Sequence, residues 1–335
     1  MKVSIPRVAV LLFTFAVSTQ VQSPQAFSKD APPLLLEQTI MLPGVKGGFD
    51  LMAADLAGRR LFVAGQDNNT LEVIDLATGK PIRSVPGFHQ PKGVVHLPEF
   101  GKLYVSNKDD GTCRVLDARS LEPIKSIAFG SKANNLRYDA QTRMIYVGYG
   151  DGAIGTIDPR DDSRGVDMPL ASYPKQFRLE ERGTRIFVNV PVANHIAVID
   201  RVSHKVLDTW AVKEEKGNVP MALDDAHQRL FIGCEPGRFV VFDTHSGKSI
   251  ASLKITEDAD GISYDAKRKF IYVSCGGGTI DVVQQVDTDH YKVVGSVPTE
   301  RGAGTSLFVP EFDRLYLAVP QTPDRPGQIR IYRPL

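Results

Sequence analysis

The sequence has few of the residues that mark disulfide-stabilised, metal-binding or catalytic proteins. Its 335 residues include only three cysteines, which cannot build the dense disulfide framework of a small secreted domain. Its seven histidines lack the close spacing that zinc sites use. No Gly-x-Ser-x-Gly elbow, phosphate-binding loop or Gly-x-Gly-x-x-Gly segment opens a helix. We therefore predict no catalytic residues, no cofactor and no metal site.

An excess of charge of either sign is also missing. Lys and Arg total 40, and Asp and Glu total 39. No strong electrostatic field therefore draws the protein toward nucleic acid or an anionic membrane. We expect nucleic acid not to be a partner.

Only one hydrophobic run raises the question of a membrane segment, and it spans Val8–Val17. Lys2 and Arg7 precede this run, and the small residues of Ala26–Ser28 offer a cleavage site, as is typical of a secretory signal peptide. Ten residues span about 15 Å as a helix, which is half of a bilayer core of roughly 30 Å. We expect residues 1–28 to be a signal peptide, the protein to be periplasmic or secreted, and no membrane span to remain.

Glycine and proline are abundant, with 29 and 22 residues, and they interrupt the chain too often for a helical bundle. An aliphatic-aromatic-aliphatic triplet recurs seven times at steps of about 42 residues, which is the signature of a repeat architecture. These anchor triplets are Leu61–Val63, Leu103–Val105, Ile145–Val147, Ile186–Val188, Leu230–Ile232, Ile271–Val273 and Leu315–Leu317.

Each repeat contains four segments with strand character. An apolar segment precedes the anchor triplet, a third segment ends in Ile-Asp or its equivalent, as at Ile74-Asp75, and a fourth follows a turn, as at Lys205–Trp210. Four strands repeated seven times predict an all-β fold, a seven-bladed β-propeller of four-stranded blades. The repeats account for nearly all of residues 29–335, which we expect to form a single domain.

The two ends of the chain are predicted to complete one blade together. The last repeat ends with Gln328–Tyr332 as its third strand and has no fourth. The segment Leu36–Leu42 resembles the fourth strands of other repeats. We therefore expect this N-terminal strand to close the last blade, so that no sheet edge is left unpaired where the termini meet.

The repeat also carries a family resemblance. The anchor, the loop with Asn or Asp that follows it and the Val-Ile-Asp ending, as in Leu61–Asp75, resemble the YVTN repeat of the YncE-like seven-bladed β-propeller family. The resemblance covers residues 35–335 and implies the fold and export from a bacterial cell, but no shared activity. The fifth and sixth repeats depart from it, since they have Gly233-Cys234 and Ser274-Cys275 where the family has Asn.

The repeat alignment also predicts whether two of the cysteines can form a disulfide. Cys234 and Cys275 occupy the same position in adjacent repeats. At the radius of the second strands their separation would be about 10 Å, beyond the usual Cα limit of about 7 Å for a disulfide. We expect both to be buried thiols.

Aligning the repeats places one residue of each at the mouth of the central channel. The first strand of each propeller blade lines this channel, and the residue eleven positions before the anchor enters that strand. Five of the seven residues are polar, and the full set is Asp50, Lys92, Asn134, Lys175, Val219, Asp260 and Gly304.

Charge is distributed unevenly around this predicted mouth. Basic residues gather on the second to fourth repeats and acidic ones, including Glu215, on the fifth to seventh. A charge in an innermost strand is costly unless it is paired or hydrated, so the basic side predicts a site for a small anionic ligand or an acidic loop of a partner protein. The predicted ligand-binding residues are Asp50, His89, Lys92, Asn134, Arg137, Lys175, Gln176, Arg178 and Asp260. The alternative is a hydrated channel whose cations pair internally with Asp50 and Asp260.

The sequence favours a monomeric, non-catalytic binding or scaffold module, and two other classes of protein remain open. A metal-dependent lactonase or lyase-like enzyme would use His89 as acid or base, but Lys92 and Lys175 would repel a cation from the carboxylates at the mouth. An accessory protein of a periplasmic redox enzyme needs no catalytic residues of its own.

Overall fold

The computed structural model describes residue 1, residues 32–213 and residues 216–335. The chain divides into two units, Met1–Ala31 and Pro32–Leu335, and every strand of the described chain belongs to the second unit. Apart from residue 1, the predicted signal peptide lies outside the described residues, as does Glu215. Within the described residues, no helix is both long enough and apolar enough to cross a membrane.

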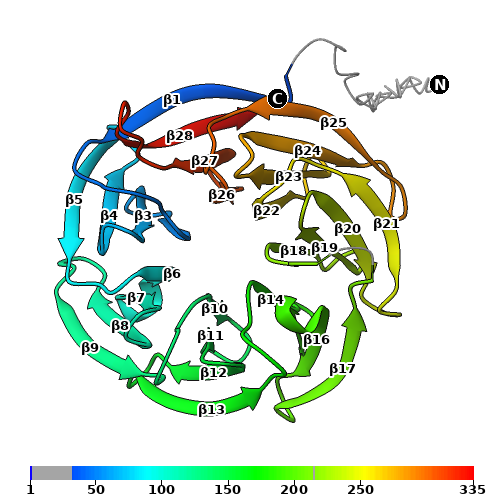
Figure 1. The fold of residues 1–335 in the computed structure, drawn as a ribbon, viewed down its shortest axis with the longest axis horizontal. Coiled ribbons are helices and arrows are strands. Elements are labelled where there is room, and N and C mark those ends of the chain that lie inside the picture. Colours follow the sequence, from blue (N-terminus) through cyan, green and yellow to red (C-terminus); the bar gives the residue numbers. More distant parts are fainter. Residues whose placement is uncertain (2–31, 214–215) are drawn as a thin grey trace. The chain divides into compact units, whose positions relative to one another are not determined.

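Seven four-stranded antiparallel sheets form a ring around a central channel (Figure 1). The predicted all-β, seven-bladed propeller is confirmed. Blades one to three comprise β2 (Met52–Asp55), β3 (Arg60–Gly65), β4 (Thr70–Asp75) and β5 (Lys80–Pro86); β6 (Pro91–Leu97), β7 (Lys102–Asn107), β8 (Thr112–Asp117) and β9 (Pro123–Ala128); and β10 (Leu136–Asp139), β11 (Met144–Tyr149), β12 (Ala153–Asp158) and β13 (Ser163–Pro169).

The next three blades repeat the same consecutive order, with the first strand of each facing the channel (Figure 1). They comprise β14 (Phe177–Leu179), β15 (Arg185–Val190), β16 (His195–Asp200) and β17 (Lys205–Ala211); β18 (Met221–Asp224), β19 (Arg229–Cys234), β20 (Arg238–Asp243) and β21 (Ser249–Lys254); and β22 (Ala259–Asp265), β23 (Phe270–Cys275), β24 (Thr279–Gln285) and β25 (Tyr291–Pro298). Two single-turn 3-10 helices, Pro98–Phe100 and Pro191–Ala193, follow β6 and β15.

The seventh blade joins both ends of the propeller. Its strand order is β1 (Leu34–Leu42), β28 (Gly327–Pro334), β27 (Arg314–Val319) and β26 (Ser306–Val309). β1 runs antiparallel to β28 from Leu34 to Leu42, with one bulge after Leu36. The predicted closure by the N-terminal strand is confirmed, and the strand begins two residues earlier than expected.

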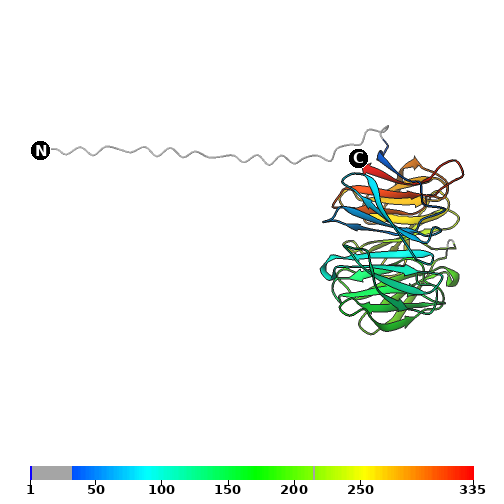
Figure 2. The ribbon, with the colours of Figure 1, turned by 90° about the vertical axis from the view of Figure 1, so that its left-hand side faces the viewer.

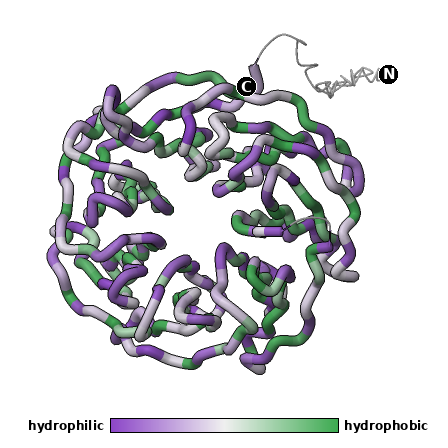
Figure 3. The backbone as a smooth tube through the Cα atoms, viewed as in Figure 1, coloured by the Kyte–Doolittle hydropathy of each residue, from purple (hydrophilic) through white to green (hydrophobic). Residues whose placement is uncertain are grey.

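The hydrophobic core lies between neighbouring blades. All seven anchor triplets lie on the second strands, and their side chains are almost wholly buried, as for Leu61, Phe62 and Val63 at 0% exposure. Each core cluster combines residues of two adjacent blades; one contains Tyr146 of blade three together with Phe177 and Ile186 of blade four. Figure 3 shows hydrophobic and hydrophilic residues in every blade. A single blade cannot bury its own faces, so the ring is held together by these contacts.

One face of the ring carries both the loops that enter the first strands and the loops that join the second and third strands. Backbone hydrogen bonds connect the two kinds of loop, from Lys108 N to Gln90 O at 3.0 Å and from Glu235 N to Lys216 O at 2.9 Å. In the side view the blades lie in one layer around the channel axis (Figure 2). The predicted mouth residues therefore have loop residues as neighbours.

The three cysteines are buried thiols and form no disulfide. The prediction of buried thiols at Cys234 and Cys275 is confirmed. Neither residue faces the channel, because both end second strands, β19 and β23.

Candidate functional site

The mouth of the channel is a cavity of about 260 Å³, called here the mouth cavity. Every blade from the first to the sixth contributes to it, because the loops before their first strands converge on the axis. Gly304 is the one predicted mouth residue that does not line this cavity. The six that line it are Asp50, Lys92, Asn134, Lys175, Val219 and Asp260.

Asp50 and Lys92 form an ion pair within this cavity. Lys92 Nζ lies 2.9 Å from Asp50 Oδ2, and the side chains are 13% (Lys92) and 19% (Asp50) exposed. The ammonium group also donates a hydrogen bond to the Gln66 side-chain oxygen. The expectation of internal pairing therefore holds for this lysine, whose charge is already compensated.

Lys175 and Asp260 lack such partners among the described residues. No carboxylate of that part of the chain lies within ion-pair distance of Lys175, whose Nζ is 5.8 Å from the centre of the Tyr173 ring. Asp260 lines the mouth cavity, where the one hydrogen bond that its carboxylate accepts from a described side chain is a long one from the Thr305 hydroxyl at 3.5 Å. Asp260 is exposed to the channel, and desolvation by the protein around it together with the nearby charge of Asp50 raises its pKa to about 6.

Two further polar groups of the mouth cavity are poorly satisfied by the described residues. Asn135 is only 4% exposed, and its side-chain oxygen accepts no hydrogen bond from them. The Tyr173 hydroxyl has no partner of good geometry there, although the Asn134 amide lies nearby. Burial and the charge of Asp50 raise the pKa of Tyr173 to about 12, so the phenol stays protonated. Because an unpaired buried polar group is costly, both atoms are poised to bond to something that enters the cavity.

Gln176 forms the floor of the mouth cavity. Its side-chain nitrogen donates to the carbonyl of Asp260 at 2.9 Å, which connects blade four to blade six, and its oxygen accepts from Met221 N at 3.3 Å. Gln176 and Leu51 line both the mouth cavity and a second cavity of about 390 Å³. The channel therefore contains two chambers that adjoin each other at these two residues.

Arg137 and Arg178 line the second cavity, called here the arginine chamber, and do not reach the mouth. Among the described residues, each makes a single hydrogen bond, to the carbonyl of the residue before it, Leu136 at 2.7 Å and Phe177 at 2.9 Å. Neither has a carboxylate partner in that part of the chain. The cations that the sequence places on one basic wall therefore lie in two different environments.

Enclosure by the protein has a strong effect on both guanidinium groups. Burial lowers the pKa of Arg137 to about 10. Burial and the positive charge of Arg137 lower the pKa of Arg178 well below its ordinary value. The charge of Arg137 therefore opposes that of Arg178, and no charge on the described chain compensates either group.

The strand registers show that these arginines occupy one level of the channel. In every blade, one first-strand residue pairs with the aromatic residue of the anchor, and the arginines hold this position in blades three and four. The seven residues at this level are Ala53, Val95, Arg137, Arg178, Ala222, Ser263 and Leu307. Five are neutral, so the positive charge is confined to one side.

His89 is not brought together with the other predicted site residues. Its ring is 62% exposed and lies 4.0 Å from the Asp110 carboxylate, outside both chambers. Among the residues that the structure describes, no group of three or more His, Cys, Asp or Glu side chains is arranged to hold a metal ion.

Sequence reasoning missed several side chains of the mouth cavity. Gln66 and Lys108 come from loops between second and third strands, three residues after the anchors of their blades, and Tyr173 comes from the loop before β14. The shared face of the two kinds of loop provides the signal, because counting forward from each anchor would have found the first two.

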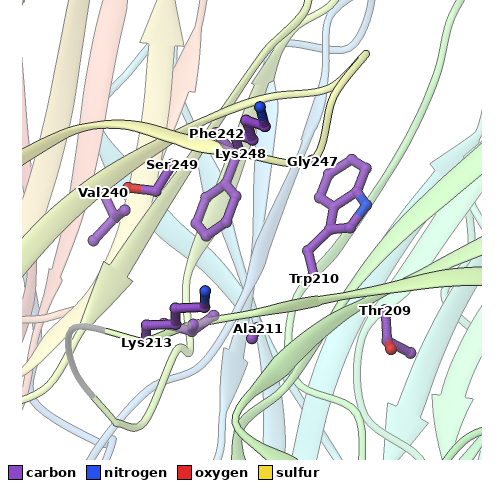
Figure 4. A pocket seen from close by; sticks show the side chains of 10 residues that line it. Thr209, Trp210, Ala211, Lys213, Val240, Phe242, Gly247, Lys248 and Ser249 are labelled. Carbon is purple, nitrogen blue, oxygen red and sulfur yellow. The ribbon is translucent and has the colours of Figure 1, made fainter.

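A third cavity, of about 640 Å³, lies between the outer strands of blades four and five (Figure 4). Trp210 packs between Phe187 and Phe242, and its indole nitrogen donates to Asp208 at 2.9 Å. Gly247 adopts φ +68°, and a Cβ there would lie 2.3 Å from that nitrogen. The indole nitrogen therefore has a hydrogen-bond partner and the ring is tightly packed. The aromatic residues of this cavity are explained by packing between the two blades.

The fold and the divided channel define the class of protein as a seven-bladed β-propeller with a polar central channel. Among solved structures, the chain is similar to Kuenenia stuttgartiensis hydrazine synthase, with a TM-score of 0.72 and 19% identity over 82% of this chain and 93% of that one. It is also similar to a chain of the mitotic checkpoint complex, with a TM-score of 0.76 and 13% identity over 96% of this chain and 99% of that one. No family model and no curated protein matches the sequence. These similarities concern the fold.

Proposed function

We propose that this protein is an exported, YncE-like propeller that acts as a non-catalytic binding module and holds a small anionic ligand in its mouth cavity. The observation that carries the proposal is the combination of an ammonium group, Lys175, that no described carboxylate pairs with and poorly satisfied buried polar atoms on Asn135 and Tyr173.

The chemistry of the mouth cavity narrows the class of ligand. Lys175 supplies the positive charge for an anionic group, since Lys92 is already paired with Asp50. The side-chain oxygen of Asn135 and the carboxylate of Asp260 accept hydrogen bonds and therefore favour a ligand with hydroxyl groups. A sugar acid combines a carboxylate with such hydroxyls and fits a cavity of about 260 Å³.

A scaffold role is the second candidate. Both similar structures are named for an enzyme or a complex, and a propeller of this shape occurs in each. An acidic loop of a partner protein, for example a periplasmic redox enzyme, would present the same carboxylate to Lys175. The lactonase or lyase interpretation has less support, because Lys92 and Lys175 share the mouth cavity with the carboxylates and disfavour a bound cation.

The proposal is tested by measuring the melting temperature with increasing glucuronate, and with glucose as the neutral comparison. We expect glucuronate to stabilise the wild type, by about 2.7 kcal/mol at one hundred times its dissociation constant, and glucose to have little effect. Lys175→Met should remove the stabilisation. Lys267→Met is the matched control, because Lys267 pairs with Asp313 and lies outside the mouth cavity.

Two results would contradict the proposal. Glucuronate and other sugar acids could fail to stabilise the wild type at millimolar concentration, or Lys175→Met could respond as the wild type does. If a purified acidic partner bound instead and Lys175→Met weakened it, the scaffold role would replace the small ligand.

A further inference from the structure

The arginine chamber differs from the mouth cavity in both charge and polarity, and this difference points to a second ligand. We propose that the chamber binds a small carboxylic acid with an apolar body, whose carboxylate lies between Arg137 and Arg178. This site is independent of the mouth cavity and goes beyond the function proposed above.

The first argument is the missing counter-charge. Each guanidinium group has five N–H donors, and among the described residues each uses one hydrogen bond, to a backbone carbonyl of its own strand. Most donors of both groups therefore remain available inside the chamber, where both side chains are partly exposed. A carboxylate accepts two parallel hydrogen bonds from a guanidinium group, and one carboxylate between two such groups would also relieve their mutual repulsion.

The second argument is the rest of the wall. Ala53, Val95 and Leu307 line the chamber at the same level as the arginines, on blades one, two and seven. Ser263 is the neutral polar residue at that level, and its hydroxyl already accepts a hydrogen bond from Phe308 N at 3.4 Å. His96, Tyr138 and Ser306 also line the chamber. At the level of the arginines, however, a ligand places the remainder of its surface against a wall that is aliphatic on blades one, two and seven.

The third argument is size. The chamber holds about 390 Å³, which exceeds what an inorganic anion needs. A sulfate or chloride ion would leave the aliphatic wall in contact with water alone. Each methylene group that a carboxylate adds against this wall should strengthen binding roughly fourfold, the equivalent of burying one CH₂ group.

The two sites adjoin at Gln176 and Leu51, and all their other lining residues differ. Gln176 is 6% exposed and forms hydrogen bonds with the backbone of blades five and six. A ligand in one chamber therefore does not displace a side chain that lines the other. The two proposals can therefore fail separately.

Calorimetric titration of the full chain at pH 7 in a low-chloride buffer, after overnight equilibration, tests this inference. The probes are acetate, butanoate, hexanoate and the neutral hexanamide. We expect affinity to rise along the three acids, by more than tenfold from acetate to hexanoate, and hexanamide not to bind. The three acids should also raise the melting temperature of the protein in the same order.

Variants assign the binding to the chamber. Arg137→Leu/Arg178→Leu should abolish hexanoate binding, and Arg178→Lys, which keeps the charge and loses the bidentate geometry, should weaken it at least tenfold. Lys175→Met, in the mouth cavity, should leave it unchanged. The melting temperature of each variant shows that it is folded.

Three results would overturn the inference. Hexanoate could fail to bind, hexanamide could bind equally well, or sulfate could compete while hexanoate binds no more tightly than acetate. The last result would show that the arginines hold an inorganic anion only.

Discussion

Neighbouring residues on the first strand of a blade lie in two different environments. Phe177 is fully buried between blades three and four, whereas Arg178, the next residue, reaches the channel without a charge partner among the described residues. The same contrast separates Leu136 from Arg137 in the preceding blade. The difference teaches that the interblade side of the strand supplies stability, while the channel side is free to carry polar chemistry.

The largest effect is expected where interblade and interstrand contacts are lost together. Deleting residues 34–43 removes β1, which pairs with β28 and buries Leu34, Ile40 and Leu42 at 2% exposure each. We expect the melting temperature to fall by many degrees, because blade seven would lose its outer strand and expose an edge. An unchanged melting curve, followed by fluorescence of the single tryptophan, would contradict closure of the ring.

A single packing residue should have the next largest effect. Phe177→Ala should lower the free energy of unfolding by about 3–5 kcal/mol, because it leaves a cavity between two blades. Urea unfolding measures this directly. Arg178→Ala is the comparison on the same strand. If it lowered the free energy of unfolding as much as Phe177→Ala, the interblade and channel sides of the strand would not differ in their contribution to stability.

The ion pair of the mouth cavity should matter less. Lys92→Met removes the cation that pairs with Asp50 and leaves this carboxylate in one cavity with Asp260, and we expect it to cost about 1–3 kcal/mol at pH 8. The loss of the Lys92 charge also raises the pKa of Asp260 further, so the cost should shrink at pH 5. Urea unfolding at both pH values is the measurement.

An exposed ion pair provides the control for that experiment. Lys132→Met removes the pair with Asp151, whose side chain is 90% exposed, and should change stability by less than about 1 kcal/mol at either pH. If the two lysine variants behaved alike, the mouth cavity would be no different from the open surface.

The smallest predicted effect is a pH dependence that originates at Asp260. Its pKa of about 6 in the folded protein exceeds the ordinary 3.8, so between these values the folded state keeps a proton that the unfolded state has lost. Stability should therefore fall as pH rises from about 4 to 6, by at most about 1 kcal/mol, since water in the channel screens the charge. Asp260→Asn should remove this part of the pH dependence of unfolding, and an identical profile in the variant would contradict it.

The architecture could be predicted from the sequence because it depends on repetition. Seven anchor triplets at nearly equal steps require seven equivalent strands, and the missing fourth strand of the last repeat required a partner from the other end of the chain. The positions of all the mouth residues except Gly304 followed from the same count, which is why Asp50, Lys92 and Asp260 meet in one cavity.

The division of the channel could not be predicted in this way. It depends on one side chain, Gln176, that reaches past blade five and donates a hydrogen bond to the backbone carbonyl of Asp260, 84 residues further along the chain. Repeat alignment gives the level of each residue but not the direction of a long side chain. For the same reason it grouped His89 with the mouth, although that ring is exposed and lies beside Asp110.

The free energy of unfolding of Arg137→Leu/Arg178→Leu, measured in a buffer without carboxylates, tests most directly whether the channel side of these strands serves binding. Removing two uncompensated charges from the channel should leave the protein at least as stable as the wild type, because apolar side chains need no counter-charge. A loss of several kcal/mol would instead show that the arginines hold the propeller together, and the channel would then be a structural feature.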